Sequence, residues 1–320
     1  MPLLFDMPLE RLQIYAGRNP CPTDMDAYWD GALAEMRAID PKTEWVRSTF
    51  QVPGVECFDL FFTGVRGARI HAKYARPARP AGRGPAVVQF HGYTGSCGDW
   101  IEKLAWVAAG FCVAALDCRG QGGLSQDPGG VTGNTHRGHI IRGLQDTPDH
   151  LLFRDIYLDT AQLAGLVMGF PEVDPKRVGA NGGSQGGGLT LACAALEPRI
   201  ARAVPVFPFL CDYRRVWEMD QAKDAYEELR WFFRVHDPEH RREDEIFMKL
   251  GYIDCQHLAK RIRAEVLMGV GLMDTVCPPS TQFAAYNKIT SPKQLALYPD
   301  YGHEGLPGMT EKAMQFMLGM

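Results

Sequence analysis

The sequence lacks the features that mark several classes of protein. Its 34 lysine and arginine residues stand against 38 aspartate and glutamate residues, a formal net charge of -4. No basic stripe indicates nucleic-acid binding. No apolar run approaches the roughly 18 residues of a spanning helix, and the first residues, MPLLFDMPLE, lack the basic start of a signal peptide. We therefore expect a cytoplasmic protein that binds neither nucleic acid nor a membrane.

Cysteine is present but follows no ligand pattern. The nine cysteines are scattered, and none forms CxxC or stands at zinc-finger spacing. Reduced thiols of a cytoplasmic protein explain such a distribution. The segment HRGH at 136–139 has two histidines, but it lacks the helix and the glutamate of a zinc protease motif. We expect no metal and no cofactor.

The order of the apolar segments predicts one α/β domain over residues 1–320. A helical extension over about 1–40 precedes three segments rich in β-branched and aromatic residues, which we interpret as antiparallel strands. Six further apolar segments alternate with helical ones, and this alternation indicates a mostly parallel sheet with helices on both faces. The predicted strands are 44–52, 55–64, 68–77, 86–92, 111–117, 177–183, 200–209, 265–271 and 293–299.

Two long segments interrupt this alternation. Residues 118–150 are rich in glycine, aspartate, histidine and arginine, and an amphipathic helix is predicted after them over 151–169. Residues 208–250 are charged and aromatic, with a helix predicted over 220–233. Long irregular segments inside a compact domain usually carry function. We interpret both as insertions over the carboxyl edge of the sheet, the second of them lid-like.

Glycines crowd around one serine where a predicted strand meets a predicted helix. The segment GGSQG at 182–186 fits the G-x-S-x-G pattern, in which the serine stands on a sharp turn above the sheet. Side chains at the flanking positions would collide with neighbouring backbone, which explains the glycines. A phosphate-binding loop would need a lysine after the glycines, and this segment has none. Ser184 is therefore the candidate nucleophile.

An acid and a histidine follow in the order that an α/β-hydrolase requires. Asp274 comes just after one predicted strand and His303 after the next, so both lie at the carboxyl edge. His303 would take the proton of Ser184, and Asp274 would orient the imidazole. The oxyanion would be bound by backbone N–H groups of Gln185 and of Tyr93, which lies in the loop HGYTG.

With these residues in place, the sequence resembles carbohydrate esterase family 7, the family of acetyl xylan esterases and cephalosporin C deacetylases. The resemblance covers almost the whole chain. The family's marks are read here as GGSQGG, RGQ and HE, at 182–187, 119–121 and 303–304, and the segment 271–287 resembles the family's surroundings of the triad acid. The resemblance implies an α/β-hydrolase fold with antiparallel leading strands and a helical insertion. It also implies a ring-shaped hexamer.

The resemblance also implies roles for further residues. Arg119 and Gln121 would brace the active-site loops, and Glu304 would help to position the histidine loop. The implied activity is removal of acetyl groups from small acetylated sugars or from an antibiotic such as cephalosporin C, without a cofactor. Aromatic residues near the acyl side would leave room for little more than a methyl group, and we expect these to be Tyr93, Phe209 and Tyr213.

Two other functions remain open. A different α/β-hydrolase, such as a broad carboxylesterase or a peptidase, would share the triad. Lipases tend to have apolar lids, whereas residues 211–245 are heavily charged. A non-enzymatic binding protein on the same scaffold would normally have lost a triad member, and none is missing here.

Overall fold

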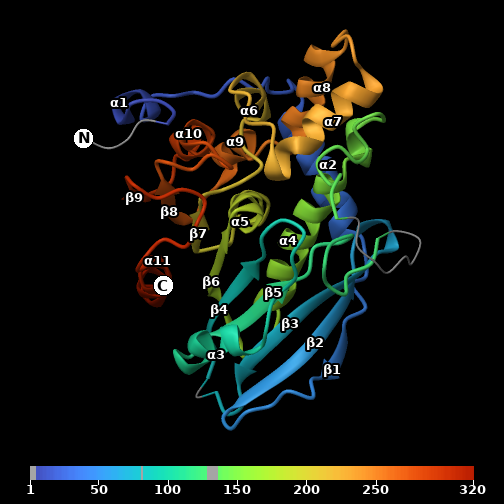
Figure 1. The fold of residues 1–320 in the computed structure, drawn as a ribbon. Coiled ribbons are helices and arrows are strands. Elements are labelled where there is room, and N and C mark those ends of the chain that lie inside the picture. The colour runs from blue at the N-terminus through green and yellow to red at the C-terminus, as the bar shows by residue number, and fades with distance from the viewer. Residues whose placement is uncertain (1–4, 81, 128–135) are drawn as a thin grey trace.

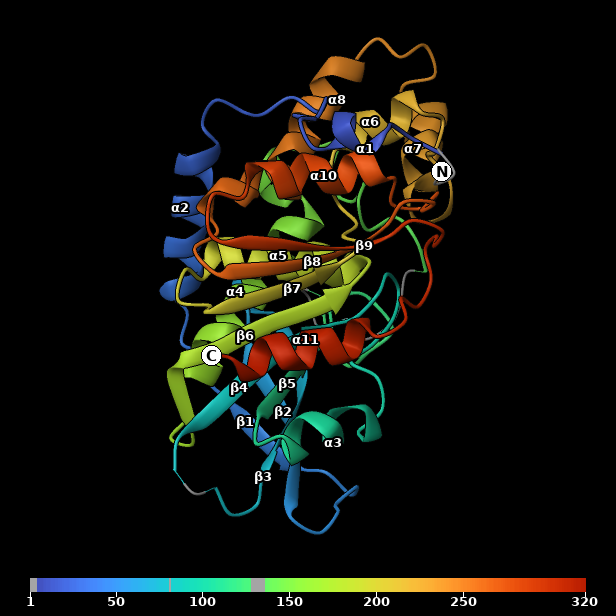
Figure 2. The same ribbon diagram turned by 90° about the vertical axis from the view of Figure 1, so that its left-hand side faces the viewer.

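The computed structural model describes residues 5–80, 82–127 and 136–320 (Figures 1 and 2). Within these residues one nine-stranded sheet runs through the molecule in the order β1-β2-β3-β5-β4-β6-β7-β8-β9. The strands are β1 Glu44–Arg47, β2 Val55–Thr63, β3 Arg69–Pro77, β4 Gly84–Phe90, β5 Cys112–Leu116, β6 Val173–Gly183, β7 Arg202–Val206, β8 Glu265–Gly271 and β9 Lys293–Tyr298.

The directions of the strands are the predicted ones. Strands β1, β2 and β3 are antiparallel, and β3 joins β5 in antiparallel fashion. From β5 to β9 all neighbours are parallel. The predicted first strand is shorter than expected, because it ends at Arg47 and only an isolated bridge at Val52 follows. The carboxyl ends of β4, β6, β8 and β9 therefore meet at one edge of the sheet.

Helices cover both faces of this sheet (Figure 1). Helices α3 and α11 pack on one face with their own apolar cluster, and α4 and α5 belong to the larger core on the other. Helix α2 packs outside α4. The helices are α1 Leu9–Leu12, α2 Met25–Arg37, α3 Ile101–Ala108, α4 Leu152–Met168, α5 Gln185–Leu196, α6 Tyr213–Glu218, α7 Glu227–His236, α8 Glu243–Leu250, α9 Cys255–Leu258, α10 Pro279–Lys288 and α11 Met309–Leu318.

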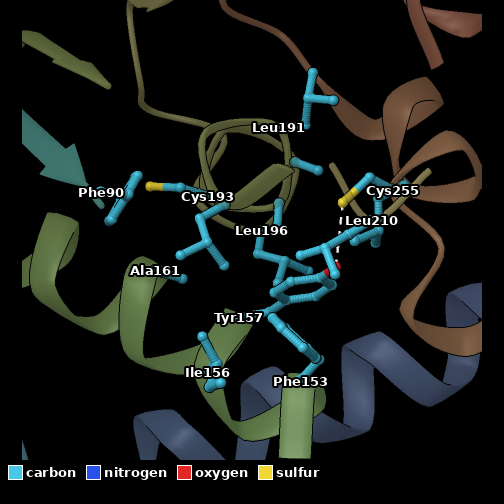
Figure 3. Packing of buried hydrophobic residues seen from close by; sticks show 14 of the residues in the cluster. Phe90, Phe153, Ile156, Tyr157, Ala161, Leu191, Cys193, Leu196, Leu210 and Cys255 are labelled. Atoms are coloured by element: carbon cyan, nitrogen blue, oxygen red, sulfur yellow. Dashed lines mark hydrogen bonds between the residues drawn. The ribbon is translucent and has the colours of Figure 1, made fainter. Parts of the chain in front are cut away.

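Helix α4 differs from the amphipathic helix that its sequence predicts. Almost all of its residues are buried, because α2 of the N-terminal extension covers the side that would otherwise face solvent. Trp29 of α2 stacks on Tyr157 at a centroid distance of 5.9 Å. Figure 3 shows α4 side chains facing those of α5, with the Tyr157 hydroxyl beside the Cys255 thiol. The extension is thus part of the core rather than an appendage.

The helical insertion comprises α6, a 3-10 turn over Asp224–Tyr226, α7 and α8. The helix predicted over 220–233 therefore begins later and continues to His236. The carboxylate of Asp212 joins the insertion to the N-terminal extension: it accepts the backbone N–H groups of Arg18 and Asn19 at 2.9 and 2.7 Å.

Two sequence predictions lie partly outside the described residues. The first is the insertion over 118–150, which contains residues 128–135, and the second is the start of the helical extension at residues 1–4. In the part of the chain that the structure describes, no helix has both the length and the apolar character to cross a membrane.

Candidate active site

Ser184 stands on a strained turn between β6 and α5. Its backbone has φ 58° and ψ -121°, a region that non-glycine residues rarely adopt and that costs about 1–3 kcal/mol. Hydrogen bonds hold the turn, since the Ser184 N–H donates to the Val206 carbonyl at 3.0 Å. The Ser184 carbonyl accepts the N–H of Phe209 at 3.0 Å. The strand β7 and the chain after it thus fix the serine above the sheet.

The glycines around Ser184 are explained by close backbone approach. A Cβ on Gly186 would lie 2.1 Å from the Phe90 carbonyl oxygen, and one on Gly182 would lie 2.6 Å from the same atom. A Cβ on Gly187 would lie 2.7 Å from the Val206 carbonyl oxygen. Real Cβ atoms are essentially never this close to backbone. The glycines therefore let α5 lie directly against β4 and β7.

The three residues of the predicted triad lie in hydrogen-bond contact. His303 Nε2 lies 2.9 Å from the Ser184 Oγ, and His303 Nδ1 lies 2.8 Å from an Asp274 carboxylate oxygen. They come from the ends of β6, β8 and β9, which meet at the carboxyl edge. A nucleophile, a base and an acid that orients the base are thereby aligned.

The surroundings of Asp274 keep its carboxylate in one orientation. The side chain is fully buried, and its Oδ1 accepts the N–H groups of Val276 and Cys277 at 2.9 and 2.8 Å. This leaves Oδ2 facing His303 Nδ1. Glu304 acts on the same loop, because its carboxylate accepts the Gly302 N–H at 3.0 Å. Both carboxylates therefore restrain the loop that presents the imidazole.

Two glutamines brace the loop after β4. The buried side-chain amides of Gln121 and Gln185 bond to each other in both directions, at 2.8 and 3.0 Å. The Gln121 carbonyl oxygen also accepts the Thr94 N–H at 3.0 Å. Among the described residues, the backbone N–H groups of Tyr93 and Gln185 have no hydrogen-bond acceptor. Both N–H groups therefore remain candidates for binding an oxyanion.

Arg119 is bonded to α4 rather than to the residues of the triad. Its guanidinium is fully buried and forms two hydrogen bonds with the Asp159 carboxylate of α4, at 2.8 and 2.6 Å. A third nitrogen reaches the Val65 carbonyl at 3.3 Å. The structure thus brings Arg119 to α4 and not to Ser184. Because Gln121 follows it by two residues, the ion pair anchors the segment that carries Gln121.

The insertion supplies a residue that could not be singled out from the sequence. The buried Glu228 carboxylate of α7 accepts a short hydrogen bond from the Tyr93 hydroxyl and bonds to the N–H groups of Ile140 and Ile141, at 2.7 and 3.1 Å. Burial raises the pKa of this carboxyl above its ordinary value, against the hydrogen bonds, which lower it. Glu228 therefore ties the loop after β4 to the segment before α4.

The structure corrects the expected acyl-side aromatics in part. Phe209 and Tyr213 have no exposed side-chain surface, because the aromatic cluster of the insertion encloses them. Phe209 packs edge-on against Tyr93 at a centroid distance of 5.5 Å and against Tyr226 at 4.3 Å. Tyr93 itself is half-buried. The side chain of Tyr93 is the one of the three that reaches the surface.

Among the described residues, two groups have the composition of a metal site. One comprises Asp274, Cys277 and His303, and both ring nitrogens of this histidine already have partners. The other contains buried His71, whose ring nitrogens lie 2.6 Å from Asp117 and 3.0 Å from Asp59. Burial alone would raise the pKa of Asp117, but its bonds to His71 and to two backbone N–H groups hold it well below the ordinary value. These contacts explain the buried histidine as a hydrogen-bonded brace between strands.

The histidines of HRGH are separated in the structure. His136 is exposed, whereas the ring Nε2 of buried His139 donates to the Gly120 carbonyl at 3.0 Å. Their segment belongs to neither of the two groups found among the described residues.

The geometry can carry out nucleophilic acyl transfer. The serine has a base within reach, and the backbone N–H groups of Gln185 and Tyr93 remain the predicted donors to an oxyanion. Such donors stabilise a tetrahedral intermediate more than the ground state, which is the source of rate enhancement.

The chain matches proteins of one family throughout its length. A sequence model described as acetyl xylan esterase (AXE1) matches residues 1–320. The structure is similar to that of acetyl xylan esterase 1 from Thermoanaerobacterium sp. JW/SL YS485, with a TM-score of 0.95 and 63% identity over 98% of this chain and 99% of that one. It is also similar to an acetyl xylan esterase from Paenibacillus sp. R4, with a TM-score of 0.91, 39% identity and the same shares covered.

A curated relative is more distant. Acetyl esterase Axe7A from Xylanibacter ruminicola is 27% identical over 291 residues, which are 88% of this chain and 63% of that protein. The matched part of this chain therefore spans less than two thirds of that relative's length. The structural likenesses confirm the α/β-hydrolase fold.

Proposed function

The chain belongs to the acetyl xylan esterase family, and on this premise we propose that it is a serine esterase that removes O-acetyl groups from small acetylated carbohydrates such as xylo-oligosaccharides. The observation that carries the proposal is the line of contacts from Asp274 through His303 to Ser184, at 2.8 and 2.9 Å. Relatives with 63% and 39% identity bear the name acetyl xylan esterase.

The first half of the reaction acylates the enzyme. His303 Nε2 takes the hydroxyl proton as Ser184 Oγ attacks the acetyl carbonyl, and the carbonyl oxygen becomes an oxyanion. The N–H groups of Tyr93 and Gln185 donate to that oxyanion. When the C–O bond to the sugar breaks, His303 returns the proton to the leaving hydroxyl. Asp274 stabilises the imidazolium between these two transfers.

The second half repeats these steps with water. His303 removes a proton from a water molecule, which attacks the acetyl-enzyme carbonyl and forms a second oxyanion at the same two donors. The bond to Ser184 Oγ then breaks, and the proton passes to that oxygen as acetate leaves. Arg119, Gln121 and Glu304 act as positioning residues in this scheme, because each holds a loop that presents a reacting group.

We propose the same route for other acetyl esters, including the acetyl group of cephalosporin C. The triad acts on the acyl group and makes no demand on the alcohol that leaves. Tyr93 packs edge-on against Phe209, which restrains its ring, and we propose that this ring forms an aromatic wall beside the oxyanion donors. A rigid wall favours acetyl over longer acyl chains, since each added methylene would require rearrangement at about 1–3 kcal/mol.

We further propose that the chain functions as one catalytic domain in a cytoplasmic homohexamer. Nine free cysteines, eight of them buried, support a reducing compartment. The hexamer rests on the family resemblance. Size-exclusion chromatography with light scattering tests the oligomer, and a monomer in solution would exclude it.

Hydrolysis of a graded ester series tests the proposed activity. We expect kcat/KM for p-nitrophenyl acetate to exceed that for the butyrate by roughly tenfold or more, from the cost of the added methylenes. We also expect release of acetate from acetylated xylo-oligosaccharides, and unchanged activity in EDTA. Peptide p-nitroanilides serve as the control for a peptidase. Faster cleavage of the anilides, or equal rates on acetate and octanoate, would refute the acetyl esterase.

A further inference from the structure

A pocket lies where the insertion meets the segment before α4. Its volume is about 330 Å³, and it is lined by Arg137, Gly138, Ile141, Glu227, Glu228 and Trp231. This volume lies at the small end of the range for ligand sites, and it suits one sugar ring better than a length of chain. In Figure 1 the helix α7, which carries three of these residues, lies beside the segment that precedes α4.

Trp231 gives this pocket an exposed aromatic surface. The side chain is 53% exposed, whereas its neighbours Phe232 and Phe233 are buried on the other side of α7. Its ring contacts His236 at a centroid distance of 5.6 Å, which restrains its orientation. A sugar ring has apolar C–H faces and a polar rim, so it can bury a face on an indole ring while its hydroxyls stay at the edge.

Hydrogen-bond donors and acceptors both lie around the Trp231 ring. Arg137 and Glu227 form an ion pair, and both side chains are about half exposed. A guanidinium offers only donors and a carboxylate only acceptors, and sugar hydroxyls need both. With two carboxylates, Glu227 and Glu228, against one guanidinium, the lining favours a neutral ligand over an anion.

The pocket wall is joined to the reacting centre through one side chain. Glu228 lines the pocket and accepts the hydrogen bond of the Tyr93 hydroxyl. The backbone of Tyr93 belongs to the loop after β4, which carries the proposed oxyanion donor. The pocket wall and the proposed oxyanion donor are therefore linked through the side chains of Glu228 and Tyr93.

We propose that this pocket is a sugar subsite, which holds a neighbouring ring of an acetylated oligosaccharide with one face on Trp231 and hydroxyls on Arg137 and Glu227. The inference rests on the proposed function and adds the part of the substrate that the triad does not contact. It predicts that the subsite matters for oligosaccharides and not for esters that lack a second ring.

Trp231→Ala tests the subsite with two substrates. We expect KM for an acetylated xylotriose to rise about tenfold, as for loss of an aromatic anchor, with kcat/KM for p-nitrophenyl acetate within about twofold of wild type. Val235→Ala is the matched control, because Val235 lies one turn further along α7, is also 53% exposed and does not line the pocket. Glu227→Gln should raise the same KM by about threefold through loss of a charged acceptor.

Direct binding separates this inference from the proposed function. We expect unacetylated xylotriose to quench wild-type tryptophan fluorescence and to bind in calorimetry, and Trp231→Ala to lose both signals. If wild type binds xylotriose but hydrolyses no acetyl ester, the subsite stands and the proposed function fails. Absence of xylotriose binding to wild type, or an equal loss on both substrates in Trp231→Ala, would overturn the subsite. A change of oligomer size in Trp231→Ala alone would instead assign this surface to contact between copies.

Discussion

The catalytic edge and the cap of this molecule are built by different means. The catalytic edge comprises the loops after β4, β6, β8 and β9, and the cap comprises residues 208–250. In the edge, positions around Ser184 are fixed by backbone: a positive φ at Ser184 and glycines that allow α5 to lie against β4 and β7. In the cap, they are fixed by side chains, such as the Glu228 carboxylate that reaches Tyr93.

This difference teaches where each region can tolerate change. A turn that depends on absent Cβ atoms accepts almost no substitution, because the atoms that would clash are main-chain atoms of neighbouring elements. A helix such as α7 buries Phe232 and Phe233 and leaves Trp231 and Val235 outside, so the packing of the fold does not restrict the residues on its outer side. The edge carries the chemistry, and the cap is the region in which substrate preference can change.

Removing the nucleophile is the largest expected effect. Ser184→Ala should lower kcat for p-nitrophenyl acetate by about 10⁴–10⁶, because the triad acts as a unit and only the oxyanion donors remain. Thermal unfolding should stay close to that of wild type, since the substitution removes one oxygen and keeps the turn. A folded variant with a tenth of wild-type activity would refute the role of the catalytic edge.

A methyl group added in the turn at Ser184, which is called the elbow below, should have the next largest effect. Gly186→Ala should lower the free energy of unfolding by about 3 kcal/mol, since its Cβ would meet the Phe90 carbonyl oxygen at 2.1 Å. Gly31→Ala is the control: nothing lies within 4 Å of a Cβ at that position of α2, and the helix should gain about 0.5–1 kcal/mol. Urea unfolding of both variants measures the contrast. Equal stabilities would mean that the elbow is not closely packed.

The catalytic edge could be predicted from the sequence because each of its features depends on residues close together in the chain. A strand, a glycine-flanked serine and a helix follow one another within a few residues, and Asp274 and His303 follow strands in the expected order. The strand directions could be predicted for the same reason. The strand ends could not be placed as well: β1 ends at Arg47 because pairing with β2 ends there.

The contacts of the cap could not be predicted from neighbouring residues in the chain. Glu228 is 135 positions from Tyr93, and a glutamate in a charged helix resembles any solvated residue until the fold is known. Phe209 and Tyr213 were expected near the acyl side of the site from their place in the chain, but neighbouring aromatics enclose them. The burial of α4 likewise depends on α2, whose packing no local pattern revealed. Contacts between distant segments decide these features.

Low pH should destabilise the contact between His257 and the N-terminal extension, which lies beside the cap. His257 of α9 bonds to the Pro20 carbonyl of the N-terminal extension at 3.1 Å, and burial, with a smaller effect of the Lys288 charge, lowers its pKa to about 4. The folded state therefore binds a proton less readily than the unfolded state. Its contribution is complete above about pH 6.5, where an unfolded histidine titrates, and is lost as pH falls toward 4.

The expected loss between pH 7 and pH 5 is on the order of 2 kcal/mol. His257→Gln should remove most of this slope in urea unfolding, whereas His136→Gln, at an exposed position, should keep it. An unchanged slope in His257→Gln would place the acid sensitivity elsewhere in the molecule.

The smallest effect tests whether the cap acts on the catalytic edge at all. Glu228→Gln replaces a carboxylate that accepts bonds from Tyr93, Ile140 and Ile141 with an amide whose NH₂ group faces donors. Leaving a buried donor unsatisfied costs about 1–3 kcal/mol. If that cost displaces the backbone N–H of Tyr93, the proposed oxyanion donor, kcat for p-nitrophenyl acetate should fall about tenfold with KM little changed.

The control for this variant is the adjacent residue. Glu227→Gln changes an exposed carboxylate that pairs with Arg137, and it should leave turnover of p-nitrophenyl acetate unchanged. The pH profile adds a readout that a mere loss of packing would not move. Because burial raises the pKa of Glu228, the carboxylate that accepts these bonds is lost as pH falls through that raised value. The fall in kcat that this protonation causes at low pH should disappear in Glu228→Gln. A lower melting temperature with unchanged kcat and an unchanged acid limb would mean that Glu228 only braces the fold, and that the cap and the catalytic edge work independently.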